Sequence, residues 1–423
     1  MMKAALTACA AQAKARMDML PEGWREVRFS EVTEFSAFGP RFSADLYDAT
    51  GNVGVIRTTD INANGNIDYT NVPLARIPES LFSHILEDGD LLITRSGTCG
   101  IVSIFKEQTI PMIAGAFLIR FKIKDVFNNE YIARILMHPL LQKEIRKISS
   151  GGVQKNISGT NIGKLKLLLP PFPEQEKIAA VLSTWDKAIS TTDALLANSR
   201  QQKKALMQQL LTGKRRLPGF TGEWLSRHLS EIGTTYTGIT GKSKEDFGKG
   251  KFFIPYTNIF NNASVDINYL EKVDILDGEC QNVVQYGDIL FTTSSETPDE
   301  VGMSSVVLDE IENIYLNSFC FGFRLHNFCE LSPIYAKFLF RGEIFRKNVI
   351  VLAQGATRYN LPKKQFLNIN ISFPPLDEQR AIAAVLDAAD REIVLLEQKA
   401  ARLREEKKAL MQQLLTGKRR VRL

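Results

Sequence analysis

The chain has 423 residues, of which 44% are hydrophobic and 24% charged, and its formal net charge is +6. This composition is ordinary for a soluble globular protein of two to four domains, and the small basic excess only slightly favours a polyanionic partner. The cysteines form no CxxC pair and no apolar run reaches roughly 18 residues, so we expect a cytoplasmic protein rather than a disulfide scaffold, a zinc ribbon or a membrane protein.

Residues 1–20 contain a short Ala-rich run after Lys3. The run is too short and too weakly apolar for a secretory leader, and it continues into Lys14 and Arg16. We therefore predict a frayed amphipathic helix at the N-terminus.

Two long stretches, residues 20–170 and 217–373, have the pattern of α+β domains. Short β-rich runs such as 90–94 and 288–292 are separated by turn signals such as Asn64-Gly65. Each stretch also has one helical pattern near its end, at residues 131–148 and 333–352. We predict one α+β domain in each stretch.

A long helix is predicted after the first domain. Apolar residues recur at alternating spacings of four and three from Ile178, and seven of ten such positions are apolar. Pro-Pro and acidic residues stand at its start, and Gly213 marks its end. This pattern is typical of a coiled-coil seam. The predicted seam residues of this helix are Ile178, Leu182, Trp185, Ile189, Leu196, Leu206 and Leu210.

A second long helix after the second domain repeats the first. Residues 203–216 and 407–420 are identical at an offset of 204, and nine of ten seam positions of the second helix are apolar. Fainter repeats occur in the globular segments, among them Phe-Ser-Glu-Val at 29–32 and Leu-Ser-Glu-Ile at 229–232. The chain is therefore a tandem duplication. The predicted seam residues of the second helix are Ile382, Leu386, Ile393, Leu396, Leu403, Leu410 and Leu414.

The predicted fold class is α+β, with two globular domains separated by two long antiparallel coiled-coil helices and related by pseudo-two-fold symmetry. Antiparallel packing is expected because parallel packing would require the second globular domain to span the full length of the helical rod. The predicted divisions are 1–169 for the first globular domain with its tail, 170–213 for the first helical region, 214–373 for the second globular domain, and 374–423 for the second helical region with its basic tail.

The sequence lacks the motifs of an enzyme. It contains neither a GxxxxGK[ST] phosphate loop nor a GxGxxG after a strand. The Phe-Pro-Pro-Leu at 373–376 lacks the Asp or Asn of an amino-methyltransferase loop, and Pro298-Asp299 is not followed by the ExK of a nuclease motif. We expect a non-catalytic protein without a metal site.

Several polar loops carry side chains that suit nucleic acids. Arg fits guanine, Asn and Gln fit adenine, and Ser and Thr fit phosphate. The basic tracts 214–216 and 418–420 are interpreted instead as structural or subunit-docking segments, because cations near helix C-termini are favoured by the helix dipole. The candidate DNA-binding residues are Arg57, Thr58, Thr59, Asn62, Arg95, Ser96, Thr98, Gln154, Lys155, Asn156, Tyr256, Asn258, Thr293, Ser294, Ser295, Thr357, Arg358, Tyr359 and Asn360.

The chain resembles the specificity subunit of Type I restriction-modification systems over residues 20–420. PPLDEQRAIAAVLD at 374–387 and PPFPEQEKIAAVLS at 170–183 look like the family's entry to each conserved helical region. GDLLITRSGTCGIV at 89–102 and GDILFTTSSETPDEVG at 287–302 are similar to common elements of the two recognition domains. The first helix entry departs from the usual pattern at Pro173, where an acidic residue is common.

The resemblance implies that each globular segment is a target recognition domain that reads one half of a bipartite target in double-stranded DNA. The helices would set the spacer and dock two methyltransferase subunits, which carry S-adenosylmethionine and methylate adenine. Two restriction subunits that use ATP and Mg would join them. The chain itself would bind no cofactor.

Two other hypotheses stay open from the sequence. A coiled-coil scaffold whose two heads bind carbohydrate or protein would need the same helices. A stand-alone methyltransferase or nuclease is opposed by the missing motifs. Sequence-dependent binding of duplexes by the methyltransferase complex, weakening with salt, would favour DNA recognition.

Overall fold

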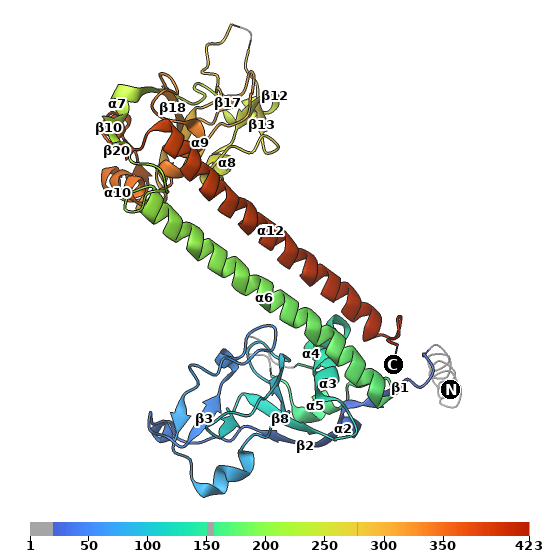
Figure 1. Ribbon diagram of the computed structural model, residues 1–423. Helices are drawn as coiled ribbons and strands as arrows, with labels where there is room; N and C mark the ends of the chain where they lie inside the picture. The colour runs from blue at the N-terminus through green and yellow to red at the C-terminus, as the bar shows by residue number, and fades with distance from the viewer. Residues whose placement is uncertain (1–19, 150–155, 277, 423) are drawn as a thin grey trace. The chain divides into compact units, whose positions relative to one another are not determined.

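The computed structural model describes residues 20–149, 156–276 and 278–422 (Figure 1). The predicted N-terminal helix and the candidate residues Gln154 and Lys155 lie outside the described residues. The chain forms two compact units, one made of Met1–Thr191 and Ala400–Leu423, the other of Thr192–Lys399. Both divisions fall inside the long helices, so each unit contains one globular domain and a segment of both helices.

The first unit is built on an antiparallel sheet with the strand order β2-β8-β5-β6. It also contains the three-stranded sheet β4-β3-β7 and the pair β1-β9. The strands are β1 (Arg25–Arg28), β2 (Thr33–Phe38), β3 (Val53–Ile56), β4 (Leu74–Ala75), β5 (Leu91–Thr94), β6 (Val102–Ile104), β7 (Met112–Ala114), β8 (Leu118–Ile123) and β9 (Lys166–Leu169). The helices of this domain are α2 (Phe29–Val32), α3 (Asn129–Leu136), α4 (Pro139–Ile148), α5 (Gly159–Gly163) and the 3-10 turns η1 (Ala44–Leu46), η2 (Thr58–Asp60) and η3 (Glu79–His84).

The second unit repeats this plan with the sheet β11-β18-β14-β16, the sheet β13-β12-β17 and the pairs β10-β20 and β15-β19. The strands are β10 (Leu225–His228), β11 (Gly233–Thr237), β12 (Phe247–Ile254), β13 (Glu271–Val273), β14 (Ile289–Thr292), β15 (Ser294–Ser295), β16 (Ser304–Val306), β17 (Tyr315–Leu316), β18 (Cys320–Leu325), β19 (Tyr359–Asn360) and β20 (Asn370–Phe373). The helices are α7 (Leu229–Ile232), α8 (Tyr256–Asn261), α9 (Pro333–Leu339), α10 (Glu343–Leu352), α11 (Lys363–Leu367) and the turns η4 (Lys244–Asp246) and η5 (Pro298–Glu300).

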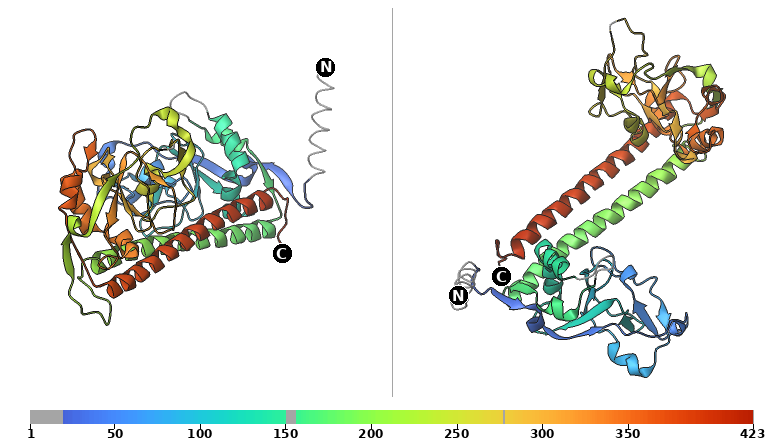
Figure 2. Two further views of the ribbon diagram at one scale, coloured as in Figure 1. Left: turned by 90° about the horizontal axis from the view of Figure 1, so that it is seen from above. Right: turned by 180° about the vertical axis from the view of Figure 1, so that it is seen from behind.

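The two long helices are α6 (Phe172–Leu210) and α12 (Leu376–Leu414), each 39 residues long. Both are uninterrupted in every view (Figures 1 and 2). At 1.5 Å per residue each helix is roughly 58 Å long. The predicted stop residues Gly213 and Gly417 have φ of 68° and 72°, the left-handed conformation that suits glycine after a helix end.

Ion pairs within each unit show that the helices run antiparallel. In the first unit Lys407 pairs with Asp186. In the second unit Lys203 pairs with Asp390. Asp390 is the repeat equivalent of Asp186, and Lys203 is the repeat equivalent of Lys407, so the two ion pairs are equivalent. The predicted α+β class and antiparallel pairing are confirmed within the units. Each Lys occupies a seam position and its side chain is 23% exposed, while the side chains of Asp186 and Asp390 are 42% and 29% exposed, so these pairs lie at the edge of the seam.

The predicted seam positions are buried or half-buried, as the spacing indicates. Ile178, Leu182, Ile382 and Leu386 are 0% exposed and belong to the cores of their globular domains. The other ten predicted seam residues are buried or half-buried, and none of them is exposed: Trp185, Ile189, Leu196, Leu206, Leu210, Ile393, Leu396, Leu403, Leu410 and Leu414.

The Glu-Gln pair at each helix entry fastens the helix to its unit. Glu174 is 1% exposed and accepts hydrogen bonds from Arg420 at 3.2 and 2.7 Å. Gln175 donates to the carbonyl of Pro170 at 2.9 Å and accepts the N–H of Asn128 at 3.0 Å. These contacts explain why both residues recur in the repeat. They also support the structural interpretation of the basic tract that contains Arg420.

The second unit makes the equivalent contacts. Glu378 is 1% exposed and accepts hydrogen bonds from Arg216. The guanidinium of Arg216 therefore compensates the charge of this buried carboxylate. Gln379 donates to the carbonyl of Pro374 at 2.8 Å and accepts the N–H of Ser332 at 2.9 Å. The duplicated sequence therefore encodes a duplicated set of contacts.

The predicted single helices at 131–148 and 333–352 are each two helices. In the first domain α3 ends before His138, whose extended ψ of 138° precedes Pro139 at the first position of α4. A residue before proline avoids the helical conformation. In the second domain Gly342, with ψ of 149°, separates α9 from α10. Periodicity alone did not reveal these breaks, because both helices of each pair have one buried face.

The faint repeats in the globular segments have structural equivalents. α2 and α7 are single turns closed by Glu31 and Glu231, which accept the N–H of Arg28 and His228 at 3.0 Å each. Within the described parts of the chain, no helix is both long enough and apolar enough to cross a membrane.

Candidate nucleic-acid interface

A buried ion pair fixes the start of the strand that leads into a candidate loop in each domain. In the first domain the carboxylate of Asp90, 2% exposed, lies 2.7 Å from Nε of Arg120. Burial raises the pKa of Asp90, although its hydrogen bonds and Arg120 oppose that rise. In the second domain Asp288 accepts hydrogen bonds from Arg324 at 2.8 and 2.7 Å and from Tyr236 at 2.7 Å. The repeated Gly-Asp before each strand was visible in the sequence, but its function was not.

The structure brings together candidate loops that are far apart in the sequence. In the first domain Ser96 bridges with Asn156, and the N–H of Ile157 donates to the carbonyl of Arg95 at 3.0 Å. In the second domain β15 pairs with β19, and the N–H of Leu361 donates to the carbonyl of Thr293 at 2.9 Å. The two domains thus use the same backbone connection to build one surface from two loops.

Each joined pair of loops presents an arginine beside an exposed aromatic ring. The guanidinium carbon of Arg95 lies 4.4 Å from the ring centroid of Phe38, which is 45% exposed. The guanidinium carbon of Arg358 lies 5.2 Å from the ring centroid of Phe319, which is 54% exposed. Nothing in the sequence pattern marked these phenylalanines, because a phenylalanine in a β-rich segment is more often part of the core.

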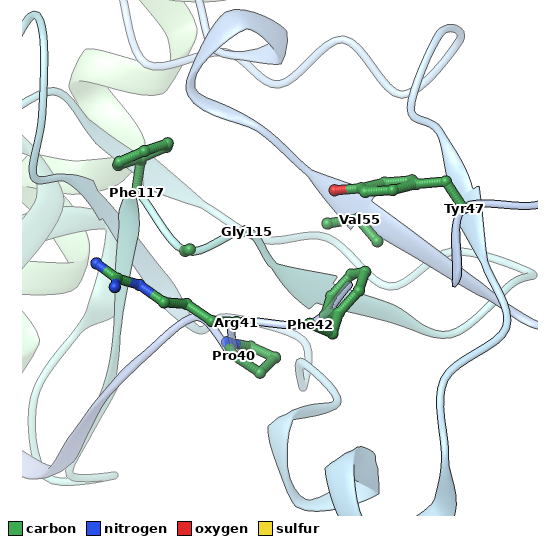
Figure 3. Close-up of a pocket in the computed structure, with 8 residues that line it drawn as sticks. Pro40, Arg41, Phe42, Tyr47, Val55, Gly115 and Phe117 are labelled. Carbon is green, nitrogen blue, oxygen red and sulfur yellow. The ribbon is translucent and has the colours of Figure 1, made fainter. Parts of the chain in front are cut away.

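A pocket of about 300 Å³ lies next to this surface in the first domain (Figure 3). Phe117 lines it, and the carbonyl of Phe117 accepts the N–H of Arg95 at 2.9 Å. Its walls combine aromatic rings with a guanidinium and a phenol, groups that stack on bases and contact phosphates. The lining residues are Pro40, Arg41, Phe42, Tyr47, Val55, Gly115, Ala116 and Phe117.

Most candidates in the joined loops and in the turn after β3 have accessible side chains. Those that are exposed are Thr59, Thr98, Asn156, Thr357, Arg358 and Asn360, and those that are half-buried are Thr58, Arg95, Ser96, Thr293 and Tyr359.

Arg57 and Asn62 are already engaged within the loop between β3 and β4. Arg57 donates to the carboxylate of Asp60 at 3.1 and 2.7 Å, and this hydrogen bonding raises the pKa of Arg57. The side-chain oxygen of Asn62 accepts the N–H of Asn64 at 3.0 Å and of Asn66 at 3.1 Å. Although both side chains reach the surface, they organise this loop.

The prediction that Asn258 contacts DNA is wrong. Its side chain is 0% exposed and donates to the carbonyls of Asp266 and Tyr269 at 2.8 and 2.7 Å. Its side-chain oxygen accepts the N–H of Asp266 at 3.0 Å. An amide whose donors and acceptor are used inside the domain cannot read a base.

Ser294 and Ser295 are also corrected, because they are buried and support the loop, and the half-buried Tyr256 contributes to the same support through its hydroxyl. Ser294 is 4% exposed and accepts a hydrogen bond from Nε of Arg358 at 3.1 Å. Ser295 is 8% exposed and donates to Glu300 at 3.1 Å. The hydroxyl of Tyr256 donates to the carbonyl of Ser294 at 3.0 Å, and burial raises the pKa of this phenol. The sequence of a polar turn does not show whether its short polar side chains point to solvent or into the domain.

The described residues contain no cluster of three or more His, Cys, Asp or Glu side chains that could hold a metal ion. The arrangement at the joined loops can donate hydrogen bonds and stack on planar groups. It is therefore suited to binding a polyanion with bases.

Comparison with known proteins gives the family. The model of the Type I restriction modification DNA specificity domain matches residues 21–198 and again 221–405. The chain is 27% identical over 361 residues to the MjaX type I restriction enzyme specificity subunit of Methanocaldococcus jannaschii, covering 82% of this chain and 79% of that one.

Solved structures share the fold. The S subunit of a Type I restriction-modification system from M. genitalium matches with a TM-score of 0.57 at 14% identity, covering 94% of this chain and 96% of that one. A chain from a structure of type I restriction-modification complex assembly and conformational transition matches with a TM-score of 0.57 at 18% identity, covering 94% and 99%. Because two copies of the family model together span most of its residues, the chain belongs to the Type I restriction-modification DNA specificity family and contains two specificity domains.

Proposed function

We propose that this chain is the non-catalytic DNA-recognition subunit of a Type I restriction-modification complex, and that each globular domain reads one half of a bipartite target. The observation that carries the proposal is the pair of joined loops. They share the same backbone connection, at Ile157 and at Leu361, while the side chains that they present differ. A constant framework with different surface residues is what two different half-sites require.

The long helices would set the spacer between the half-sites. The ion pairs Asp186–Lys407 and Lys203–Asp390 support this function, because charged residues at particular seam positions favour one register over others. Half-sites one helical turn apart are separated by about 34 Å, which a helix of roughly 58 Å can bridge.

The helices would also dock two methyltransferase subunits. Val394 and Leu395 on α12 are 47% and 64% exposed, and such apolar side chains on a helix surface suit a protein partner. In this proposal the methyltransferase subunits hold S-adenosylmethionine and methylate adenine. Two restriction subunits hold ATP and Mg, and this chain holds no cofactor. The missing phosphate-loop and methyltransferase motifs support that division of functions.

The test is to map methylated adenines across the host genome with and without this gene. A split motif that is methylated in the parent strain and unmethylated after deletion supports the proposal and supplies both half-sites and the spacer. A genome whose methylation is unchanged by the deletion contradicts it.

A further inference from the structure

We infer that Arg95 and Arg358 are the guanine-reading residues of the two half-sites, each held in place by stacking on Phe38 and Phe319. The inference rests on the proposed function and specifies the base that each domain recognises. A guanidinium presents paired N–H donors that match O6 and N7 of guanine in the major groove.

These two arginines differ from those that stabilise the fold. Arg120, Arg324 and Arg341 are tied to carboxylates or carbonyls of their own domains. Within the described residues, the guanidinium of Arg95 has no hydrogen bond or ion pair, and Arg358 uses only Nε, which donates to Ser294 at 3.1 Å. The terminal nitrogens of both therefore remain available as donors.

Nε of Arg95 is buried without a hydrogen-bond partner within the described residues. Burying a donor without a partner is unfavourable, and the contact with Phe38 at 4.4 Å offsets part of that cost while limiting the side chain to few rotamers. An arginine that is already ordered loses less conformational entropy when it binds. The geometry thus favours a specific base contact over a mobile phosphate contact.

The two arginines arrive from different loops and stack on different strands. Arg95 follows β5 and stacks on Phe38, the last residue of β2. Arg358 precedes β19 and stacks on Phe319, the residue before β18. β2 pairs with β8 in the first sheet, and β11, which takes the place of β2, pairs with β18 in the second, so the two phenylalanines lie on strands at neighbouring places in the repeated sheet. The guanine is therefore expected at a different position in each half-site, measured from the same edge of the recognition domain.

The experiment uses the reconstituted methyltransferase complex and duplexes that carry the motif found by methylation mapping. Each guanine is replaced in turn by 7-deazaguanine, which removes the N7 acceptor and keeps Watson–Crick pairing. In each half-site, replacement of one particular guanine is expected to weaken binding by about tenfold to a hundredfold. Arg95→Ala should remove this sensitivity at the guanine of one half-site, and Arg358→Ala at the guanine of the other.

Phe38→Ala tests the stacking. It keeps the arginine charge, so it should reduce discrimination at the Arg95 guanine while leaving the salt dependence of binding unchanged. Arg25→Ala is the matched control, because the guanidinium of Arg25 also lies over a phenylalanine ring, that of Phe127 at 5.8 Å, and Arg25 is outside the joined loops and the pocket. It should leave the sensitivity to 7-deazaguanine intact.

The possible outcomes distinguish failure of the guanine assignment from failure of the proposed function. If the wild-type complex prefers the motif but each arginine variant keeps full sensitivity to every 7-deazaguanine, the guanine assignment is wrong and the proposed function stands. If the wild-type complex does not distinguish the motif from a scrambled duplex, the proposed function fails as well.

Discussion

Glu174, in the first turn of α6, and Arg420, beyond the end of α12, form a hydrogen-bonded ion pair across 246 positions of sequence. Arg216 and Glu378 form the same pair in the second unit, with the helices exchanged. Each unit therefore fastens the start of one long helix to the segment that follows the other. This contact accounts for the arginine at the last position of each identical tract, 203–216 and 407–420.

Breaking one pair should loosen one unit. Arg420→Gln is expected to speed amide hydrogen exchange in β1 and in the first turn of α6, because it leaves the buried Glu174 carboxylate without its cation. Arg216→Gln should have the same effect around β10 and the start of α12. Arg419→Gln is the control, since its exposed side chain makes no ion pair within the described residues. Equal exchange in all three variants would show that the pairs do not stabilise the units.

The seam residues at the ends of the helices should stabilise the fold more than exposed apolar residues of the same helices. Leu386→Ala is expected to lower the free energy of unfolding by about 2–5 kcal/mol, because Leu386 is 0% exposed in the core of the second unit. Leu195→Ala, at a position 48% exposed in the same unit, should change it by less than about 0.5 kcal/mol. Urea denaturation of the full chain measures both. Similar losses for the two variants would contradict the assigned seam.

His138 should make the first unit sensitive to mild acid. Its ring is 5% exposed and Nδ1 accepts the N–H of Leu140 at 3.3 Å, and burial lowers its pKa below the ordinary 6.5. The unfolded chain then binds more protons below pH 6.5, so the free energy of unfolding falls as the pH drops from 6.5 through the folded pKa. Thermal unfolding at several pH values should show this loss, and His138→Asn should remove it.

The control is His326→Gln, at an exposed position. It should keep the pH dependence of the wild-type chain. A wild-type unfolding free energy that does not fall below pH 6.5 would show that His138 is not buried as a neutral cap of α4.

Asn258 should matter for stability rather than for sequence recognition. Asn258→Ala removes four hydrogen bonds of a fully buried amide and is expected to lower the free energy of unfolding by about 1–3 kcal/mol. Thr357→Ala, at an exposed loop position, should leave stability unchanged. Folded Asn258→Ala complex should still methylate the wild-type motif. A changed motif would return Asn258 to the DNA interface.

The architecture was predictable because its signals are local and repeated. The seam from Ile178 to Leu210 and the stop at Gly213 follow from helical spacing and from the conformation that glycine permits. Asp90 and Arg120 could not be paired from the sequence, because their contact depends on which strands become neighbours. Pro139 indicates a helix break in the sequence, but the apolar periodicity on both sides of it favoured a single helix.

The sequence predicts which types of residue form the candidate interface, but it does not predict which loops come together or which side chains point outward. Arg95 and Asn156 were both selected as polar loop residues, and only the fold shows that their loops join. Asn258 has the same local features and lies inside the domain. The direction of a short polar side chain in a turn is set by tertiary hydrogen bonds, which the sequence does not display.

If each domain reads its half of the target independently, variants confined to one domain change only one half of the methylated motif. Methylated adenines are mapped in cells that express the chain with Arg95→Ala and Ser96→Ala, or with Arg358→Ala and Asn360→Ala. The first pair of substitutions should relax one half of the motif, the second pair should relax the other half, and the spacer should stay the same. Relaxation of the same half by both pairs, or of both halves by either pair, would contradict it.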